Sequence, residues 1–176
     1  MMNYRNYGYN VIIINETATE IVKSQEYSGK ESDCEIASMI VNHQLKKELE
    51  AENVAKNALK PYVIVCDRSI IEPAAYIGID NMKHLLEQHG KSYEYIRDSY
   101  DLVIHITTAA KGAEEYYTKE NNEARSENIV QARNIDDNIL QIWSEHPNRF
   151  IVDNLNKSFN DKLEEIKNII VDYITR

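Results

Sequence analysis

Residues 62–69 read Tyr62-Val63-Ile64-Val65-Cys66-Asp67-Arg68-Ser69, a short continuous apolar run that ends at once in charged and polar residues. An unbroken apolar run of this length is typical of a strand that is buried on both of its faces. Further runs of the same kind are Val11-Ile12-Ile13-Ile14-Asn15, Leu102-Val103-Ile104-His105-Ile106 and Phe150-Ile151-Val152. Strands covered on both sides are typical of a parallel sheet, in which helices must form the crossovers.

The intervals between these runs carry the apolar spacing of helices. Gly90 is placed as a helix C-terminal cap, and Ser158 followed by Asp161 has the spacing of a capping box. Strands that alternate with helices predict one doubly wound α/β domain over residues 1–176. The residues on the expected apolar helix faces are Ile36, Ile40, Val41, Leu45, Leu49, Met82, Leu85, Leu86, Ile129, Ala132, Ile135, Ile139, Ile142, Trp143, Phe159, Leu163, Ile166, Ile170 and Ile174.

The composition excludes several classes of protein. Of the 176 residues, 43% are hydrophobic and 28% are charged, which excludes a disordered tail and a membrane-embedded protein. The 29 acidic and 20 basic residues leave a net charge of −9, which argues against sequence-independent binding of nucleic acid. Cys34 and Cys66 lie far apart and form no disulfide framework, and no apolar run is long enough to span a membrane. We therefore expect a cytoplasmic protein.

Polar residues follow every predicted strand. In open α/β sheets ligands bind outside the carboxyl ends of the strands, so these residues are the first candidates for a site. Asp67 has two interpretations that spacing does not separate: it holds a magnesium ion beside a nucleotide, or it caps the following turn while Arg68 pairs with it or with Glu72. The residues after the four strands are Asn15, Glu16, Thr17, Asp67, Arg68, Ser69, Thr107, Thr108, Asp153 and Asn154.

The segment from Ala109 to Arg133 is long and polar for a connection between a strand and a helix. Long loops in compact domains are often functional lids, and arginines on a lid can neutralise charge on a phosphate chain. Arg125 and Arg133 are the candidates here. Arg133 has a strong alternative interpretation, because Asp136 and Asp137 lie one helical turn further on and would pair with it.

Other chemistries find little support in the sequence. The five histidines show no His-x-x-x-His spacing, and the cysteines form no Cys-x-x-Cys pair, so we expect no transition-metal site. His105 lies within a predicted strand and is interpreted as a hydrogen-bonded core residue rather than a ligand. A Gly-x-Ser-x-Gly motif of serine hydrolases is absent from the sequence.

Taken together, the residues that follow the strands resemble those of the NadR-like P-loop ATPase and kinase domain family. The resemblance covers nearly the whole chain in the right order, although each piece is short. The matching segments are Asn15–Glu20, Val65–Ser69 with Ala75-Tyr76, Tyr100–Ala110, Tyr117–Arg125, Gln131–Arg133, His146-Pro147 and Asp153-Asn154, together with Phe159 and Lys162.

This resemblance implies a three-layer α/β fold of the nucleoside and nucleotide kinase type, with a mostly parallel sheet. It implies Mg²⁺ with ATP or GTP as cofactors and a small-molecule phosphoryl acceptor as the second substrate. Asp67 would be the acid near the metal, and Arg68 would point toward a phosphate or the acceptor. Residues 107–125 would form a lid that closes over the nucleotide.

Further positions acquire roles through the same resemblance. Glu16, beside Thr17, would face the second-substrate site at the edge of the strands. Arg125 and Arg133 would be lid arginines over the triphosphate. Asp153-Asn154 would lie near the nucleotide base.

The sequence departs from this family at one important point. Such proteins begin with a strand and a Gly-x-x-x-x-Gly-Lys-Ser/Thr loop (the Walker A motif) whose backbone amides cradle the phosphates, and none of the five glycines here belongs to such a loop. In the family the missing strand is central. Its loss would leave a gap between two unpaired strand edges, to be closed by other strands or by a borrowed one.

Three explanations of this departure stay open: a reading frame that starts too late, a degenerate relative that keeps the fold, or a truncated gene. We expect a nucleotide-binding ATPase- or kinase-like protein with weak turnover. The alternative is a non-catalytic interaction module whose acidic surface and polar strand ends bind a protein partner. The preferred base, the acceptor and the oligomeric state do not follow from the sequence.

Overall fold

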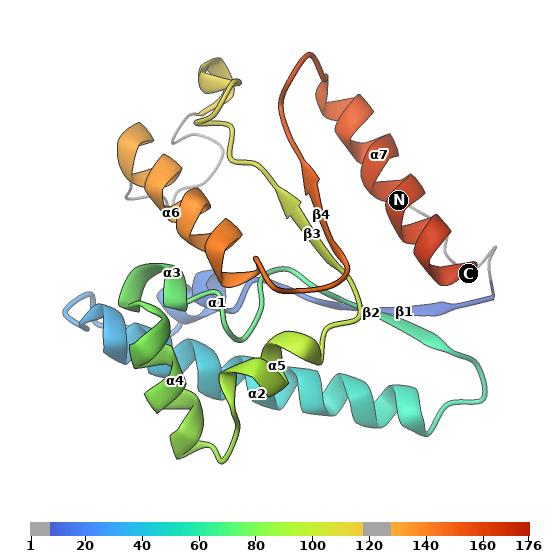
Figure 1. Ribbon diagram of the computed structural model, residues 1–176. Helices are drawn as coiled ribbons and strands as arrows, with labels where there is room; N and C mark the ends of the chain where they lie inside the picture. The colour runs from blue at the N-terminus through green and yellow to red at the C-terminus, as the bar shows by residue number, and fades with distance from the viewer. Residues whose placement is uncertain (1–7, 118–127) are drawn as a thin grey trace.

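The computed structural model describes residues 8–117 and 128–176, which form strands and helices in alternation (Figure 1). Each apolar run predicted to be a strand is one. The strands are β1 (Asn10–Ile14), β2 (Tyr62–Cys66), β3 (Val103–Ile106) and β4 (Arg149–Val152). The helices are α1 (Thr17–Lys23), α2 (Asp33–Lys56), α3 (Ala74–Ile77), α4 (Ile79–Gln88), α5 (Tyr93–Asp98), the short 3₁₀ helix η2 (Glu114–Tyr116), α6 (Ile129–Ile142) and α7 (Phe159–Ile174).

The strands form two parallel pairs rather than one continuous sheet. β1 pairs with β2, with Ile14 opposite Cys66, and β3 pairs with β4, with Ile106 opposite Val152. Helices α2 and α6 provide the respective crossovers. In Figure 1 the β1–β2 pair runs across the middle of the view and the β3–β4 pair rises from it. The predicted alternation with parallel strands is confirmed, but within the described residues no backbone hydrogen bond joins β2 to β3.

The helices begin where side chains can satisfy their first backbone amides. Ser158 and Asp161 form the predicted capping box of α7, and Ser32 begins α2 in the same way. After α4 the chain turns at Gly90 with φ of 66°, a left-handed conformation that glycine adopts without strain. No helix among the described residues is both long and apolar enough to cross a membrane.

The main core lies between α2, α4, α5, α6 and the segment that follows β2. Its fully buried side chains include Val41, Ile71, Met82 and Leu86, and Trp143 is nearly as buried. Helix α7 contributes no buried residue to it. The core therefore lies on one side of the strands, and the opposite side is less well covered.

Tyr100, just before β3, connects the β3–β4 pair to α2 and to the segment that follows β2. Its hydroxyl accepts a hydrogen bond from the amide of Ile70 (3.0 Å) and donates one to Oε1 of Glu48 on α2 (2.8 Å). Its ring meets that of Trp143 edge-on, with centroids 5.4 Å apart. Burial raises the pKa of Glu48 and raises that of Tyr100 well above its ordinary value. Side chains thus connect the two strand pairs where backbone hydrogen bonds do not.

Truncation of a central core side chain tests this arrangement. We expect Leu86→Ala to lower the free energy of unfolding by about 2–5 kcal/mol, because the side chain is fully buried and its loss leaves a cavity. Leu59→Ala is the matched control, since Leu59 is fully exposed and its truncation should change stability by less than about 0.5 kcal/mol. Urea denaturation of the two variants measures both effects, and equal losses would contradict this description of the core.

Candidate functional site

Three acidic side chains and one arginine lie at the carboxyl end of the β1–β2 pair. Glu16 follows β1, Asp67 and Arg68 follow β2, and the in-register pairing of the two strands brings them to one edge. Arg68 Nε lies 3.6 Å from a carboxylate oxygen of Glu16, and its Nη1 lies 3.2 Å from one of Glu72. The predicted pairing of Arg68 with Glu72 is therefore present, and Glu16 shares the same guanidinium.

Asp67 stands apart within this group. Its exposed carboxylate makes no hydrogen bond or ion pair with any described residue. Partial burial and the negative charge of Glu16 raise the pKa of Asp67, while Arg68 acts in the opposite direction. Two neighbouring carboxylates whose negative charge is only partly neutralised favour the binding of a cation.

The backbone at this strand end is unusual. Arg68 has φ of 75°, a left-handed conformation that is uncommon for a residue other than glycine and that often marks functional sites. The next residue, Ser69, is buried, and its hydroxyl has no hydrogen-bond partner among the described residues. Strain and an unsatisfied hydroxyl therefore occur together immediately after β2.

Asp67 and Glu16 fit the preferences of magnesium. Mg²⁺ binds carboxylate oxygens and is typically held by one or two carboxylates together with substrate phosphates and water. Among residues 8–117 and 128–176 no group of three or more His, Cys, Asp or Glu side chains is arranged to hold a metal by itself. The two carboxylates suit a metal that brings the remaining oxygen ligands with it.

The carboxyl end of β3 is organised around a buried carboxylate, that of Asp136 on α6. It lies 3.0 Å from Nε2 of His105, which confirms the interpretation of this histidine as a hydrogen-bonded core residue. It also accepts hydrogen bonds from the Thr108 amide (2.9 Å) and from Lys111 Nζ (2.7 Å), and Lys111 contacts Asp137 as well. Burial alone would raise the pKa of Asp136, but hydrogen bonds from His105, Lys111 and Thr108 lower it to about 2.

The predicted pairing of Arg133 with Asp136 and Asp137 is not observed, because Lys111 occupies both carboxylates. Arg133 instead donates hydrogen bonds to the carbonyl of Ala110 (2.6 Å) and to Glu114 (2.7 Å). It therefore fastens the loop after β3 to α6. Arg125 lies outside the described residues, as does the later part of the predicted lid over 107–125.

At the carboxyl end of β4, Asn154 is buried and fully engaged. Its amide donates to the carbonyls of Thr108 (2.9 Å) and Lys111 (2.8 Å), and its oxygen accepts from Lys162 (2.7 Å). Asp153 pairs with Lys157 at 3.1 Å. Asn154 thus holds the loop that follows β3.

Thr17 is also occupied within the fold. It is buried, its hydroxyl donates to Gln44 of α2, and it accepts a hydrogen bond from Lys47 at 3.1 Å. Its role is to fix α1 against α2. Of the candidates that follow β1 and β2, the structure leaves Glu16, Asp67 and Arg68 facing solvent at the strand ends, with Glu72 beside them.

Burial raises the pKa of Glu72, whereas the charges of Arg68 and of His105 on β3 act in the opposite direction. The two groups of charged residues lie at the carboxyl ends of β2 and β3. Sequence reasoning named Glu72 and Asp136 only as pairing partners of arginines and assigned no role to Lys111, because the contacts of Lys111 with Asp136 and Asp137 join segments that are far apart in the chain.

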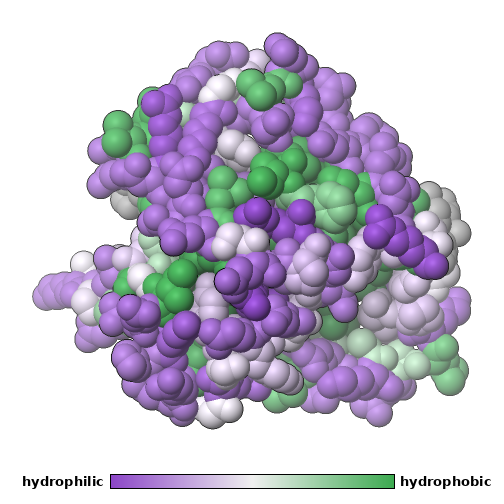
Figure 2. Space-filling view, viewed as in Figure 1, coloured by the Kyte–Doolittle hydropathy of each residue, from purple (hydrophilic) through white to green (hydrophobic). Residues whose placement is uncertain are grey.

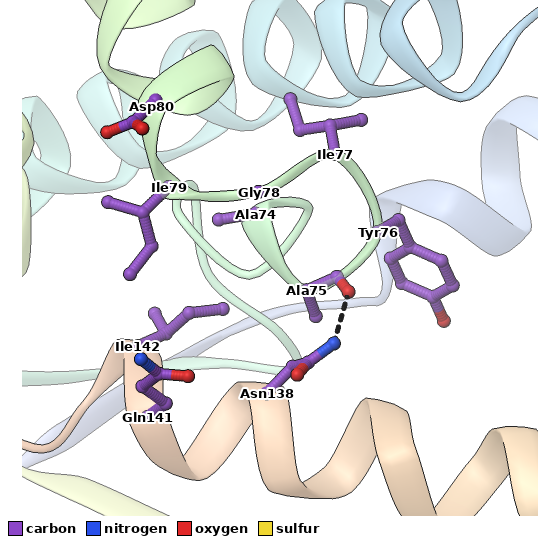
Figure 3. A pocket seen from close by; sticks show the side chains of 10 residues that line it. All are labelled: Ala74, Ala75, Tyr76, Ile77, Gly78, Ile79, Asp80, Asn138, Gln141 and Ile142. Atoms are coloured by element: carbon purple, nitrogen blue, oxygen red, sulfur yellow. Dashed lines mark hydrogen bonds between the residues drawn. The ribbon is translucent and has the colours of Figure 1, made fainter.

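A separate hollow of about 520 Å³ lies between α3, the start of α4 and α6 (Figure 3). Asn138 of α6 donates a hydrogen bond across it to the carbonyl of Ala75 (2.9 Å). Asp80 is the charged residue among those that line it, and its negative charge would repel phosphate. The hollow is therefore poorly suited to a triphosphate.

The Asp136 hydrogen bonds predict a pH-dependent contribution to stability. The pKa of this group is about 2 in the fold and 3.8 in its reference state, so its contribution of about 2 kcal/mol is present above pH 4 and is lost as the pH falls toward 2. We expect Asp136→Asn to lower unfolding free energy by about that amount at pH 7 and by less in acid. Asp137→Asn, which alters an exposed partner of the same lysine, should cost less than about 1 kcal/mol. Equal effects of the two variants in thermal unfolding at pH 7 would refute this assignment.

Comparison with known proteins identifies the family to which this chain belongs. No curated protein matches the sequence. A family model described as an AAA domain matches residues 2–162, which is most of the chain. The match includes every strand and the charged residues at the ends of β1, β2, β3 and β4. This chain therefore belongs to the AAA domain family and is a P-loop NTPase-like domain.

Proposed function

We propose that this protein binds ATP or GTP together with Mg²⁺ at the carboxyl ends of β2 and β3 and acts in phosphoryl transfer or hydrolysis, as a NadR-like ATPase or kinase. Family membership supports the nucleotide-binding part of this proposal. The observation that carries it is the carboxylate of Asp67, exposed beside Glu16 and without a partner among the described residues.

The topology supports the position of the site. In open α/β sheets ligands bind outside the carboxyl ends of the strands. Here α2 lies between β1 and β2 in the chain and α6 lies between β3 and β4, and polar residues follow both β2 and β3. Asp67 and Glu72 follow β2, and Thr108 and Lys111 follow β3.

The charges support a requirement for magnesium. Glu16, Asp67 and Glu72 outnumber Arg68 at the strand end, so a bare triphosphate would be repelled. A bound Mg²⁺, held by Asp67 with Glu16 nearby, would supply charge neutralisation between these acids and the phosphates. Arg68 would then exchange part of its contact with Glu16 for a phosphate or the acceptor.

We further propose that residues 107–125 close over the nucleotide, with Arg125 and Arg133 above the phosphates. Turnover should be weak. Lys111 and Arg133 already bind carboxylates or carbonyls, and the sequence contains no Gly-x-x-x-x-Gly-Lys-Ser/Thr loop to hold the phosphates.

Substitution of Asp67 tests the proposal directly. We expect calorimetric titration to detect binding of ATP or GTP that requires Mg²⁺, and we expect Asp67→Asn to weaken it at least tenfold, equivalent to about 1.4 kcal/mol. Asp172→Asn on α7 is the matched control, because it removes an equal charge far from the strand ends and should leave the affinity unchanged. Equal Mg²⁺-dependent affinity in the Asp67 variant and the parent protein would exclude the role proposed for Asp67.

A second candidate function is a non-catalytic interaction module. The observation that favours it is the set of apolar strand residues left exposed on the strand pairs, among them Ile13 and Ile106. Thermal unfolding with millimolar Mg-ATP and Mg-GTP separates the two functions. A ligand at one hundred times its dissociation constant adds roughly 2.7 kcal/mol of stability, and no shift with either nucleotide would favour the module.

A further inference from the structure

Gln44 of α2 is a polar side chain that lies inside the fold. Figure 2 shows hydrophilic side chains over most of one face of the molecule, apart from apolar ones gathered over the β3–β4 region. Gln44 differs from these surface groups, because only 1% of it is exposed. A buried amide that lacks hydrogen bonds costs stability, so its partners must lie within the protein.

The amide of Gln44 contacts the segments that follow both β1 and β2. Its oxygen accepts a hydrogen bond from the hydroxyl of Thr17, at the start of α1. Its nitrogen donates to the carbonyl of Arg68 (3.4 Å) and to Oε1 of Glu48 (2.8 Å). A glutamine nitrogen has two N–H donors, and both are used here. One buried side chain therefore links the two strand ends.

Both links are made next to a candidate ligand of the cation. Thr17 follows Glu16 in the chain, and Arg68 follows Asp67. The Asp67 amide donates to the Ile14 carbonyl of β1 (2.8 Å), and Glu16 lies beyond this backbone hydrogen bond. The separation of the two acids therefore depends on contacts outside the strand ladder, and the contacts of Gln44 are of this kind.

Gln44 also acts on the strained residue of the site. Arg68 has φ of 75°, and a conformation of this type persists only where the surrounding structure holds it. The hydrogen bond from Gln44 to the Arg68 carbonyl is one such restraint. The guanidinium of Arg68 in turn lies 3.6 Å from Glu16 and 3.2 Å from Glu72. A change at this backbone would move the charges around Asp67.

We propose that Gln44 is a positioning residue, which sets the separation of Glu16 and Asp67 by holding the turns that carry them in one arrangement. Gln44 acts through these turns and does not contact the cation, because its donors and its acceptor are already occupied. The inference rests on the proposed function for the identity of the cation. Mg²⁺ demands near-ideal octahedral geometry, whereas Ca²⁺ accepts flexible geometry, so Gln44 should matter for Mg²⁺ above all.

Gln44→Met tests the proposal, because methionine has a similar length and volume but makes none of these hydrogen bonds. We expect calorimetric titration to show that affinity for ATP with Mg²⁺ falls about tenfold or more. Affinity for ATP with Ca²⁺ should fall less than about threefold. Val41→Ala is the matched control, since Val41 is fully buried on the same helix. It should lower the unfolding temperature and leave both affinities unchanged.

A second measurement tests the link without nucleotide. Thr17→Val should shift the NMR signal of the Ser69 amide, because this amide shares a peptide group with the Arg68 carbonyl that Gln44 binds. Thr17→Ser keeps the hydroxyl and should leave the signal in place. Lys47→Met, which removes the other partner of that hydroxyl, should also leave it in place. In the Gln44→Met background, Thr17→Val should add no shift.

The outcomes separate this inference from the proposed function. Equal loss of affinity with the two metals, or no loss with either, would overturn the positioning role of Gln44. An unmoved Ser69 signal in Thr17→Val would overturn the link between the turns. A parent protein that binds no ATP with either metal would contradict the proposed function and the cation named here, and the Ser69 signal would then decide the link alone.

Discussion

The hydroxyl of Tyr100 connects the two strand pairs, between which the described part of the chain makes no backbone hydrogen bond. It lies between the amide of Ile70 and the carboxylate of Glu48, and the indole of Trp143 packs against its ring. Networks of buried polar groups are strongly stabilising only when every member is satisfied. The position of the β3–β4 pair relative to the β1–β2 pair depends on this contact and on the core around it.

The division of the strands into two pairs also gives the candidate site two different sides, one after β3 and one after β2. On the β3 side, Asp136 is surrounded by donors, and the loop after the strand is fixed by Asn154 and Arg133. After β2, Arg68 forms ion pairs with two acidic side chains, Glu16 and Glu72, while Asp67 has no partner among the described residues. The fixed loop after β3 can position a ligand. After β2 the acidic side chains outnumber Arg68, and a divalent cation would neutralise this excess negative charge.

Local features were predictable from the sequence, whereas long-range pairing was not. The apolar runs predicted each strand seen in residues 8–117 and 128–176, and the position of His105 within one of them predicted its burial. The separation into two sheets depends on which strands pair with each other. The apolar periodicity of the sequence predicts strands but does not specify their pairing. The partner of Arg133 was mispredicted because Lys111, distant in sequence, reaches Asp136 and Asp137 first. In the same way, the burial of Asn154 depends on contacts with the loop after β3.

The proposed function requires a divalent cation and a nucleotide to meet at the carboxyl ends of β2 and β3. Paramagnetic broadening with Mn²⁺ in place of Mg²⁺ and ATP present, followed by NMR on the labelled protein, locates the bound cation. We expect the amide signals of residues 16–20, 67–72 and 107–111 to broaden while those of α7 stay sharp. Broadening centred elsewhere, or none with ATP present, would contradict the proposed function.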